Sequence, residues 1–235
     1  LVNDLHTTLY HIDFSFDTLK LGGSAFAQSL GKVGSDVPMV QNPEYFRDAF
    51  LAVQDLINRG LVLAGHDISA GGLITTLLEM CFSNMEGGLE ISLDKIKEDD
   101  LIKILFAENP GVVIQVANKH KDLVKKILED AGVGYVKLGK PTDERHILVE
   151  KDGATYQFGI DYMRDVWYST SYLLDRRQSM NGCAKARYEN YKMQPVELAF
   201  MPGFTGKLSQ YGISPDRRTP TGIRAAIIRE KGTNG

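Results

Sequence analysis

The residues with the clearest chemical potential lie in one short stretch, GHDISAGGLITTLLEM, from Gly65 to Met80. A carboxylate (Asp67) and a hydroxyl (Ser69) precede two adjacent glycines, Gly71 and Gly72, and an apolar helical pattern follows. Free N–H groups and the positive end of the dipole at the start of a helix favour an anion. Asp67 would offer the hard oxygen that Mg²⁺ prefers. The stretch therefore predicts a site for a phosphate and its metal ion.

The same residues also have a purely structural interpretation. Asp67 or Ser69 can cap the helix, because their side-chain oxygens accept hydrogen bonds from the first backbone N–H groups. His66 would then be a half-buried, hydrogen-bonded residue, whereas in a ligand site it would orient the carboxylate or meet the ligand. Caps are far more common than metal sites, so spacing alone favours the structural interpretation.

The bulk composition limits the functional classes. A net charge of -3 over 235 residues gives no basic surface for nucleic acid or an anionic membrane. No apolar run approaches the roughly 20 residues of a membrane-spanning helix, and the first residues lack the pattern of a signal peptide. Cys81 and Cys183 are far apart in the sequence, which indicates a reducing compartment. We expect a cytoplasmic protein with protein and small-molecule partners, and with no nucleic acid or membrane partner.

Hydrophobic periodicity predicts alternating helices and strands, typical of a layered α/β domain of about 140 residues. Helices are expected over residues 24–30, 44–59, 73–82, 119–131, 161–178 and 183–191. Strands are expected over residues 61–64, 111–116, 133–138, 146–150 and 155–158. The dipeptide Asp152-Gly153 predicts a tight hairpin turn between the last two strands. Proline and glycine in 195–222 predict a linker.

Both ends suggest a piece of a longer polypeptide. The opening sequence, LVNDLHTTLYHIDF, resembles the end of a strand that has already begun. Residues 225–229 form an apolar strand pattern that usually opens an α/β unit, and its partners would lie downstream.

Five blocks of sequence, in order and with fitting spacing, resemble the phosphoribosylformylglycinamidine synthase family, the large amidotransferases of purine biosynthesis. They are LGGSAFAQSLG, GHDISAGGLITTLLEMCFS, LFAENPGVVIQV, DVWYSTSYLLDRRQ and IRAAIIREKGTNG. The resemblance implies an ATP-dependent carbon–nitrogen ligase with glutamine as amido donor. It would convert formylglycinamide ribonucleotide into formylglycinamidine ribonucleotide through an iminophosphate. Mg²⁺ and ATP or ADP would be bound.

The resemblance also implies a domain map. Residues 1–15 would end a preceding synthase domain of the N-terminal type. Residues 16–160 would form an α/β (α+β) sandwich like the C-terminal domain of aminoimidazole ribonucleotide synthetase. Residues 161–222 would be a helical bridge and extended linker, and residues 223–235 the truncated first strand of a glutaminase domain. The other synthase domains and the glutaminase would be partners in the same polypeptide, so the chain alone would be inactive.

Carried over by position, the resemblance implies roles for the opening stretch. Asp67 would be a magnesium ligand, and Ser69, Gly71 and Gly72 would bind the nucleotide. His66 would support them, and no residue is assigned a catalytic role.

The family usually has an acidic residue before the paired glycines, where this chain has Ala70. The nucleotide site would then be weakened, or it would be the noncatalytic one of two pseudo-equivalent sites. Which of the two sites Asp67 serves stays open.

Three further residues are weaker candidates. Glu108 and Asn109 resemble a segment whose internal counterpart in the family faces the substrate, but a polar turn before Pro110 explains them equally well. Gln41 is similar to a substrate-facing glutamine of the paired domain, although the start of a proline-containing helix is a simpler explanation.

Two alternative functions remain open. The chain could be a noncatalytic scaffold that binds ADP only to stabilise the architecture. It could also be another ATP-using member of the superfamily, of the selenophosphate synthetase or thiamine-phosphate kinase type, which lack a following glutaminase strand.

Overall fold

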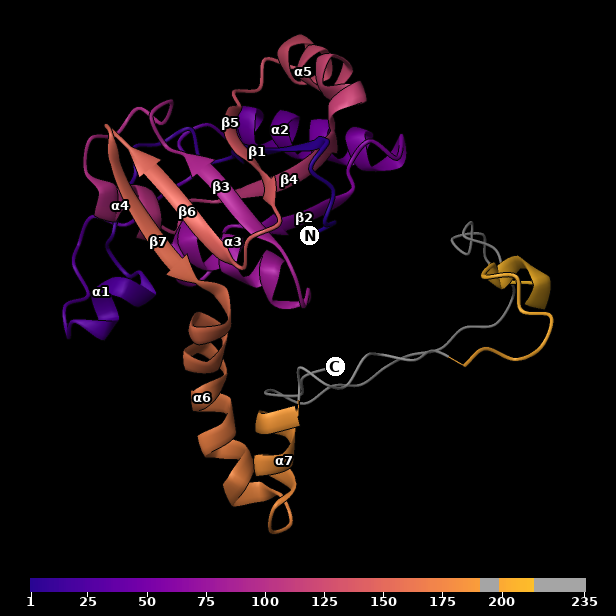
Figure 1. Cartoon of the computed structure of the whole chain (residues 1–235). Coiled ribbons are helices and arrows are strands. Elements are labelled where there is room, and N and C mark those ends of the chain that lie inside the picture. The colour runs from indigo at the N-terminus through magenta and orange to yellow at the C-terminus, as the bar shows by residue number, and fades with distance from the viewer. Residues whose placement is uncertain (191–198, 214–235) are drawn as a thin grey trace, which may run out of the picture. The chain divides into compact units, whose positions relative to one another are not determined.

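Seven strands form one mixed sheet in the order β2-β4-β1-β5-β3-β6-β7 (Figure 1). The computed structural model describes residues 1–190 and 199–213. The strands are β1 (Thr7–Asp13), β2 (Ala64–Asp67), β3 (Gly88–Ser92), β4 (Gly111–Ala117), β5 (Val136–Thr142), β6 (His146–Lys151) and β7 (Ala154–Gly159). Neighbouring strands are antiparallel except for the parallel pair β3 and β6.

The helices are α1 (Ala25–Ser29), α2 (Pro43–Asn58), α3 (Gly72–Phe82), α4 (Leu101–Phe106), α5 (Lys121–Asp130), α6 (Ile160–Gln178) and α7 (Cys183–Asn190). Helices α3, α4 and the start of α6 cover one face of the sheet, and α2 and α5 cover the other. Short 3₁₀ turns occur at Asn118–His120 and Leu208–Tyr211. The expected helices are confirmed, with ends that shift by a few residues.

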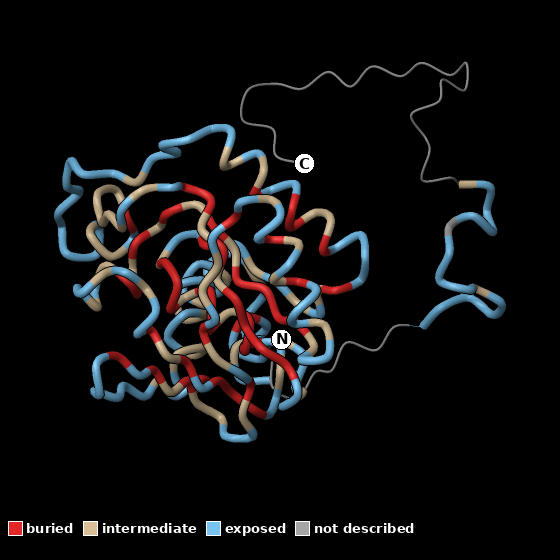
Figure 2. Tube along the Cα trace, turned by 90° about the horizontal axis from the view of Figure 1, so that it is seen from above, coloured by how far each residue is buried: buried red, intermediate tan, exposed pale blue. Residues whose placement is uncertain are grey.

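Alternation along the strands divides the core into two layers. On β1, Leu9 packs with α3, α4 and the start of α6, whereas Tyr10 and Ile12 pack with α2 and α5 on the opposite face. Successive side chains of a strand point to opposite faces, so one strand can supply both layers. Figure 2 shows the resulting buried centre beneath exposed outer segments. The expected α/β (α+β) sandwich is confirmed.

Local signals account for two well-predicted elements. The side chain of Asn42 accepts hydrogen bonds from the N–H groups of Glu44 (3.0 Å) and Tyr45 (3.1 Å), and Pro43 begins α2. These are preferred residues for the cap and first position of a helix. Asp152 and Gly153 both have positive φ, 50° and 78°, as the predicted hairpin turn between β6 and β7 requires.

Two strand predictions are shifted. The expected strand at 61–64 is wrong, because pairing with β4 begins only at Ala64, and the strand extends to Asp67. Leu61 is apolar because it packs in the layer of α2 and α5, not because it belongs to a strand. Likewise, Val133 is buried after the end of α5, and β5 begins three residues later, at Val136.

The sequence prediction missed two short elements. Strand β3 has five residues, and α4 has six. The side chain of Asp100 caps α4 by accepting a hydrogen bond from the N–H group of Ile102 (2.9 Å). Segments this short contain too few turns or alternations to give a clear period.

The structure also bears on the expected domain limits. Residues 1–15 are expected to belong to a preceding domain, yet β1 lies inside this sheet, paired with β4 and β5. These residues therefore fold with the sandwich. Helices α6 and α7 are present in the region expected to be a helical bridge, and their role as a bridge stays a prediction. The expected linker is described only from 199 to 213, and the expected strand at 223–235 lies outside the described residues.

A membrane-spanning segment is not found in the part of the chain that the structure describes. None of its helices combines the length and the apolar character that crossing a bilayer requires.

Candidate functional site

Three loops gather at one edge of the sheet. Asp13, the last residue of β1, pairs with Gly111, and Asp67, the last residue of β2, pairs with the adjacent Val112. The ends of β1 and β2 therefore lie beside the start of β4. Residues 14–24 follow β1, residues 68–71 follow β2, and residues 107–110 precede β4. We call this place the site edge.

Asp67 presents its carboxylate to solvent at the site edge, with 74% of the side chain exposed. His66 Nδ1 lies 3.5 Å from Asp67 Oδ1, and His66 Nε2 lies 3.2 Å from Glu79 Oε2 on α3. The Asp67 carbonyl accepts a hydrogen bond from Thr76 Oγ1 (3.0 Å), which fixes the end of β2 to α3. His66 thus lies between two carboxylates, and its supporting role stays a prediction.

The side chains around Asp67 could hold a metal ion only together with a bound phosphate compound. In the described residues, no three His, Cys, Asp or Glu side chains are grouped so that they could hold an ion. Mg²⁺ commonly binds through one or two carboxylates plus substrate phosphates and water. The single exposed carboxylate of Asp67 fits that mode, and it does not fit a site built entirely from protein ligands.

The expected side-chain cap of α3 is wrong. Gly71 is the capping residue, with φ of 90° and no side-chain hydrogen bond, so neither Asp67 nor Ser69 caps the helix. Ser69 is exposed, and its carbonyl accepts a hydrogen bond from the N–H group of Gly72 (3.0 Å). A tight turn with left-handed backbone takes the place of a side-chain cap.

Close packing explains the paired glycines. Gly72 has φ of 70°, and a Cβ atom there would lie 2.7 Å from the Leu105 carbonyl oxygen and from backbone atoms of Phe106. A Cβ atom on Gly71 would lie 2.3 Å from Thr75 Oγ1. Gly72 therefore lets the start of α3 approach the end of α4 closely, and Gly71 leaves room for the side chain of Thr75.

Glu108 joins two helix starts with one carboxylate. Its Oε1 atom accepts hydrogen bonds from the N–H groups of Gly71 (2.8 Å) and Ala25 (2.7 Å). Phe26 on α1 stacks on Phe106 at the end of α4, with ring centroids 4.6 Å apart. Although the chain has alanine at position 70, an acidic group from Glu108 lies at the start of α3 all the same.

Asn109 holds the loop that follows β1. It is 4% exposed, and its Nδ2 group donates to Ser15 Oγ and to the Thr18 carbonyl, both at 3.1 Å. Its Oδ1 atom accepts a hydrogen bond from the Lys20 N–H group at 3.4 Å. Both polar atoms of the Asn109 side-chain amide therefore have hydrogen-bond partners within the protein.

Gln41 binds the same loop from the segment before α2. Its N–H group donates to the Ser15 carbonyl (2.9 Å). Loss of solvation raises the pKa of Asp17, but hydrogen bonds from Lys20, Gln41 and two backbone N–H groups outweigh it and bring the pKa to about 2. The structure therefore brings Gln41 and Asn109 to the loop 14–24, and brings Glu108 to Gly71.

The low pKa of Asp17 predicts an acid-dependent loss of stability. A carboxyl group whose pKa falls on folding stabilises the fold above its unfolded pKa, near 3.8, and this is lost as the pH falls towards 2. We expect Asp17→Asn to lower the Tm at neutral pH, and the difference from the parent to shrink below pH 4. Thermal unfolding from pH 7 to pH 2 measures it. Asp55→Asn, which removes a surface pair with Arg59, should have little effect. Parallel curves for parent and Asp17→Asn would contradict the assignment.

A cleft of about 600 Å³ opens beside the loop 14–24. Asp13, Asp17 and Asn109 line it, whereas Asp67 and Ser69 do not. Sequence reasoning missed Asp13 and Asp17. The signal was present in DFSFD, because aspartate at the end of a strand often accepts hydrogen bonds from the next N–H groups in a turn.

Comparison with known proteins gives a consistent result for most of the chain. Residues 14–151 match the family model described as AIR synthase related protein, C-terminal domain. A probable phosphoribosylformylglycinamidine synthase (chloroplastic/mitochondrial) of Arabidopsis thaliana is 35% identical over 232 residues, which cover 97% of this chain and 16% of that protein. The Homo sapiens phosphoribosylformylglycinamidine synthase is 32% identical over 231 residues, 97% of this chain and 17% of that protein. The chain thus spans about a sixth of the length of these curated relatives.

Solved structures support the fold. PurL of Thermotoga maritima described as complexed with FGAR has a TM-score of 0.55 and 14% identity, covering 68% of this chain and 28% of that one. The same protein described as complexed with ATP has a TM-score of 0.53 and 13% identity, covering 68% of this chain and 26% of that one. At such identities the likeness concerns the architecture.

Proposed function

The chain belongs to the family of the AIR synthase related protein, C-terminal domain, and from this premise we propose that it is part of an ATP- and glutamine-dependent phosphoribosylformylglycinamidine synthase. The observation that carries the proposal is the 35% identity to a curated synthase over 97% of the chain. The whole enzyme would convert formylglycinamide ribonucleotide, ATP, glutamine and water into the amidine ribonucleotide, ADP, phosphate and glutamate. ATP would phosphorylate the amide oxygen, and ammonia would displace the phosphate.

The site edge is suited to the nucleotide of this reaction. Ile68 is 9% exposed, between the exposed Asp67 and Ser69. Residues two apart in an extended segment face the same side, so one ligand can meet both. Asp67 would bind Mg²⁺ and Ser69 the nucleotide, while His66 would keep the carboxylate in place through its contact 3.5 Å away. The metal ion would neutralise charge on the phosphates.

Not every group of the turn is available to the ligand. The Gly71 N–H group already donates to Glu108, and the Gly72 N–H group donates to the Ser69 carbonyl. In the proposed site the glycines would therefore shape the turn and let a phosphate approach, with the hydroxyl of Ser69 as the contact. Glu108 and Asn109 would act as supports of the loops.

The remaining parts of the enzyme would be supplied by the same polypeptide. The other synthase domains would complete the nucleotide and substrate sites, and a glutaminase domain would supply ammonia. A cytoplasmic location stays a prediction, since the Arabidopsis relative is described as chloroplastic/mitochondrial.

An activity assay on the full-length protein tests the proposal. We expect product from formylglycinamide ribonucleotide only with Mg²⁺ and ATP, one ADP released per product, and ammonium salt able to replace glutamine. Thiamine phosphate and selenide, offered in parallel, should not support ATP cleavage. ATP cleavage with either of those, and none with formylglycinamide ribonucleotide, would establish a different member of the superfamily.

A second candidate role for the chain is to hold a nucleotide that stays bound and stabilises the architecture. Ala70 stands where the family usually has an acidic residue, which favours the noncatalytic one of the two nucleotide sites. Dialysis separates the two roles. A structural nucleotide would be recovered from the dialysed and then denatured protein in about one equivalent, whereas a substrate nucleotide would be lost.

A further inference from the structure

Phe16 combines two unfavourable features at one position. Its φ is 53°, in the left-handed region that bulky residues rarely adopt. Its side chain is 60% exposed, although it is a large apolar ring. Residues held in such backbone conformations gather at functional sites, where the surrounding structure imposes them.

The hydrogen bonds of neighbouring aspartates impose the conformation of Phe16. Asp13 Oδ2 accepts a hydrogen bond from the Phe16 N–H group (2.8 Å), and Asp13 Oδ1 accepts from the N–H group (3.2 Å) and hydroxyl (2.7 Å) of Ser15. Directly after Phe16, Asp17 accepts from the Thr18 N–H group (2.9 Å) and from Lys20 Nζ (2.9 Å). The backbone on both sides is therefore fixed by polar contacts, and the exposed position of the ring is specified by the chain itself.

The ring of Phe16 forms part of the wall of the 600 Å³ cleft together with Tyr45. The two ring centroids are 4.9 Å apart, at an interplanar angle of 47°. The hydroxyl of Tyr45 accepts a hydrogen bond from the Gly134 N–H group (3.1 Å), so the second ring is also held. A cleft of this volume, with apolar walls and a few polar groups, is of the size that takes a small molecule.

The charged groups of the cleft indicate which small molecules would fit. Lys95 and Lys97 also line it, and both are exposed. Within the described residues, neither lysine takes part in an ion pair. Three carboxylates also line the cleft. Asp13 accepts hydrogen bonds within the loop 14–24, Asp17 pairs with Lys20, and Glu98 lies 3.7 Å from Lys103. Among the charged groups of the cleft, Lys95 and Lys97 are therefore the ones left to attract an anion.

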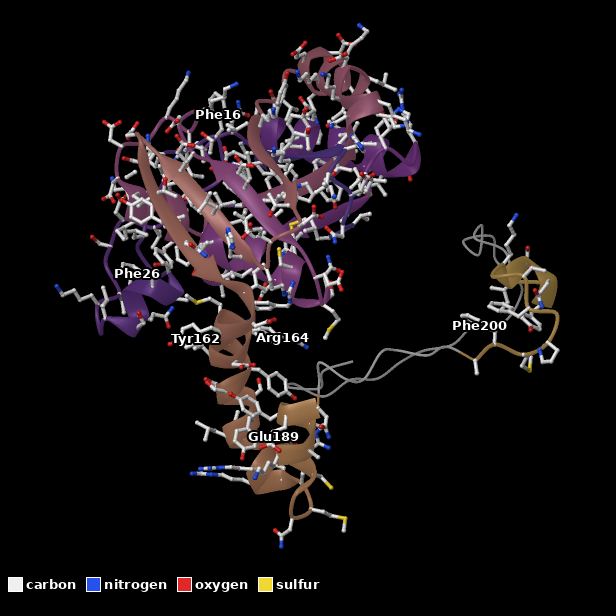
Figure 3. The ribbon with its side chains drawn as sticks, viewed as in Figure 1. Phe16, Phe26, Tyr162, Arg164, Glu189 and Phe200 are labelled. Atoms are coloured by element: carbon white, nitrogen blue, oxygen red, sulfur yellow. The ribbon has the colours of Figure 1, made fainter. Side chains whose placement is uncertain are left out.

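We propose that this cleft binds a small molecule in which a planar ring carries an anionic group, with Phe16 as the ring contact and Lys95 and Lys97 as the anion contacts. Ile68 also lines the cleft, so the cleft borders the turn of Asp67, but Asp67 and Ser69 themselves do not line it. In Figure 3, Phe16 lies well away from Phe26. Phe26 belongs to α1, and the carboxylate of Glu108 joins the start of α1 to the start of α3. The inference does not depend on the proposed synthase activity.

The test uses the full-length protein and adenosine 5′-monophosphate as the probe, in EDTA so that no metal is available at Asp67. Calorimetric titration should detect binding by the parent. Phe16→Asn should raise the Kd about tenfold, because the ring contact is lost, while its Tm stays equal to or above that of the parent, because asparagine tolerates positive φ. Phe16→Gly should behave in the same way, and serves if the first variant does not fold.

Further variants assign the anion contacts and the specificity of the effect. Replacing both lysines, Lys95→Gln and Lys97→Gln, should weaken binding of the monophosphate and leave binding of uncharged adenosine unchanged. Asp152→Asn is the matched control, because Asp152 also has positive φ, 50°, and its hydrogen bond to Asp94 comes from the backbone N–H group, which the substitution retains. It should leave the Kd unchanged, as should Asp67→Asn. The proposal is overturned if the parent binds no probe, as expected when another segment of the protein fills the cleft. It is also overturned if Phe16→Asn binds like the parent, or if Asp67→Asn abolishes binding.

Discussion

Replacing Asp67 by asparagine is expected to remove the stabilisation of the full-length protein by magnesium nucleotide, while leaving its stability without nucleotide unchanged. A ligand at 100 times its Kd stabilises a folded protein by about 2.7 kcal/mol. If the lost carboxylate weakens binding about 100-fold, only about 0.4 kcal/mol remains at the same concentration. The free protein should tolerate the change, because 74% of the Asp67 side chain is exposed and asparagine has nearly the same shape.

Thermal unfolding with and without MgADP measures this effect independently of enzyme activity. Asp143→Asn is the matched control, since it also removes an exposed carboxylate, in the turn between β5 and β6. It should keep the full nucleotide-dependent rise in Tm. If Asp67 serves the catalytic site, kcat should also fall about 100-fold, because metal-ion stabilisation of the reacting phosphates contributes several kcal/mol. An undiminished rise in Tm with Asp67→Asn would exclude Asp67 as a ligand.

The parts of the fold that the sequence predicted well are those whose determinants are local. Helix α2 follows Asn42 and Pro43 and then repeats its apolar residues every three or four positions. The hairpin at Asp152 and Gly153 needs only two residues able to adopt positive φ. For such elements neighbouring residues carry enough information to set both the type and the place of the element.

The parts that were misplaced depend on contacts across the chain. The limits of β2 follow from its pairing with β4, about 50 residues away in the sequence. The apolar residues Leu61 and Val133 pack in a core layer outside any strand, and a periodicity argument cannot separate the two cases. The place of β1 inside the sheet depends on β4 and β5, which lie beyond residue 110.

The candidate site divides in the same way. The chemical types in HDISAGG were visible, and Asp67 and Ser69 do lie exposed at the end of β2. Proximity in sequence suggested that these side chains cap α3, but Glu108, 37 residues beyond Gly71, accepts that hydrogen bond. The sequence did not identify Phe16 as a candidate binding residue, because its left-handed backbone is visible only in the structure.

Replacing Gly72 by alanine is expected to destabilise the protein strongly. At φ of 70°, alanine costs about 1 kcal/mol in backbone conformation. Its Cβ atom would also lie 2.7 Å from the Leu105 carbonyl oxygen and from the backbone of Phe106, neither of which can rotate away as a side chain could. Forced overlap in a packed core adds about 2 kcal/mol. The sum of about 3 kcal/mol corresponds to a fall in Tm of about 6–12 °C for a domain of this size.

Gly132→Ala separates the two contributions, because Gly132 has nearly the same φ, 68°, but no atom within 4 Å of the position of a Cβ atom. It should lose only the conformational part, about 1 kcal/mol. Urea unfolding of both variants measures the difference between their losses in the free energy of unfolding, which should be about 2 kcal/mol. This difference is the cost of overlap between the start of α3 and the end of α4. Equal losses would mean that α4 moves aside freely, and the close packing of Gly72 would then not explain why this turn lacks a side chain. A larger loss at Gly72, with MgADP affinity reduced as well, would tie the packing of this turn directly to the shape of the proposed site.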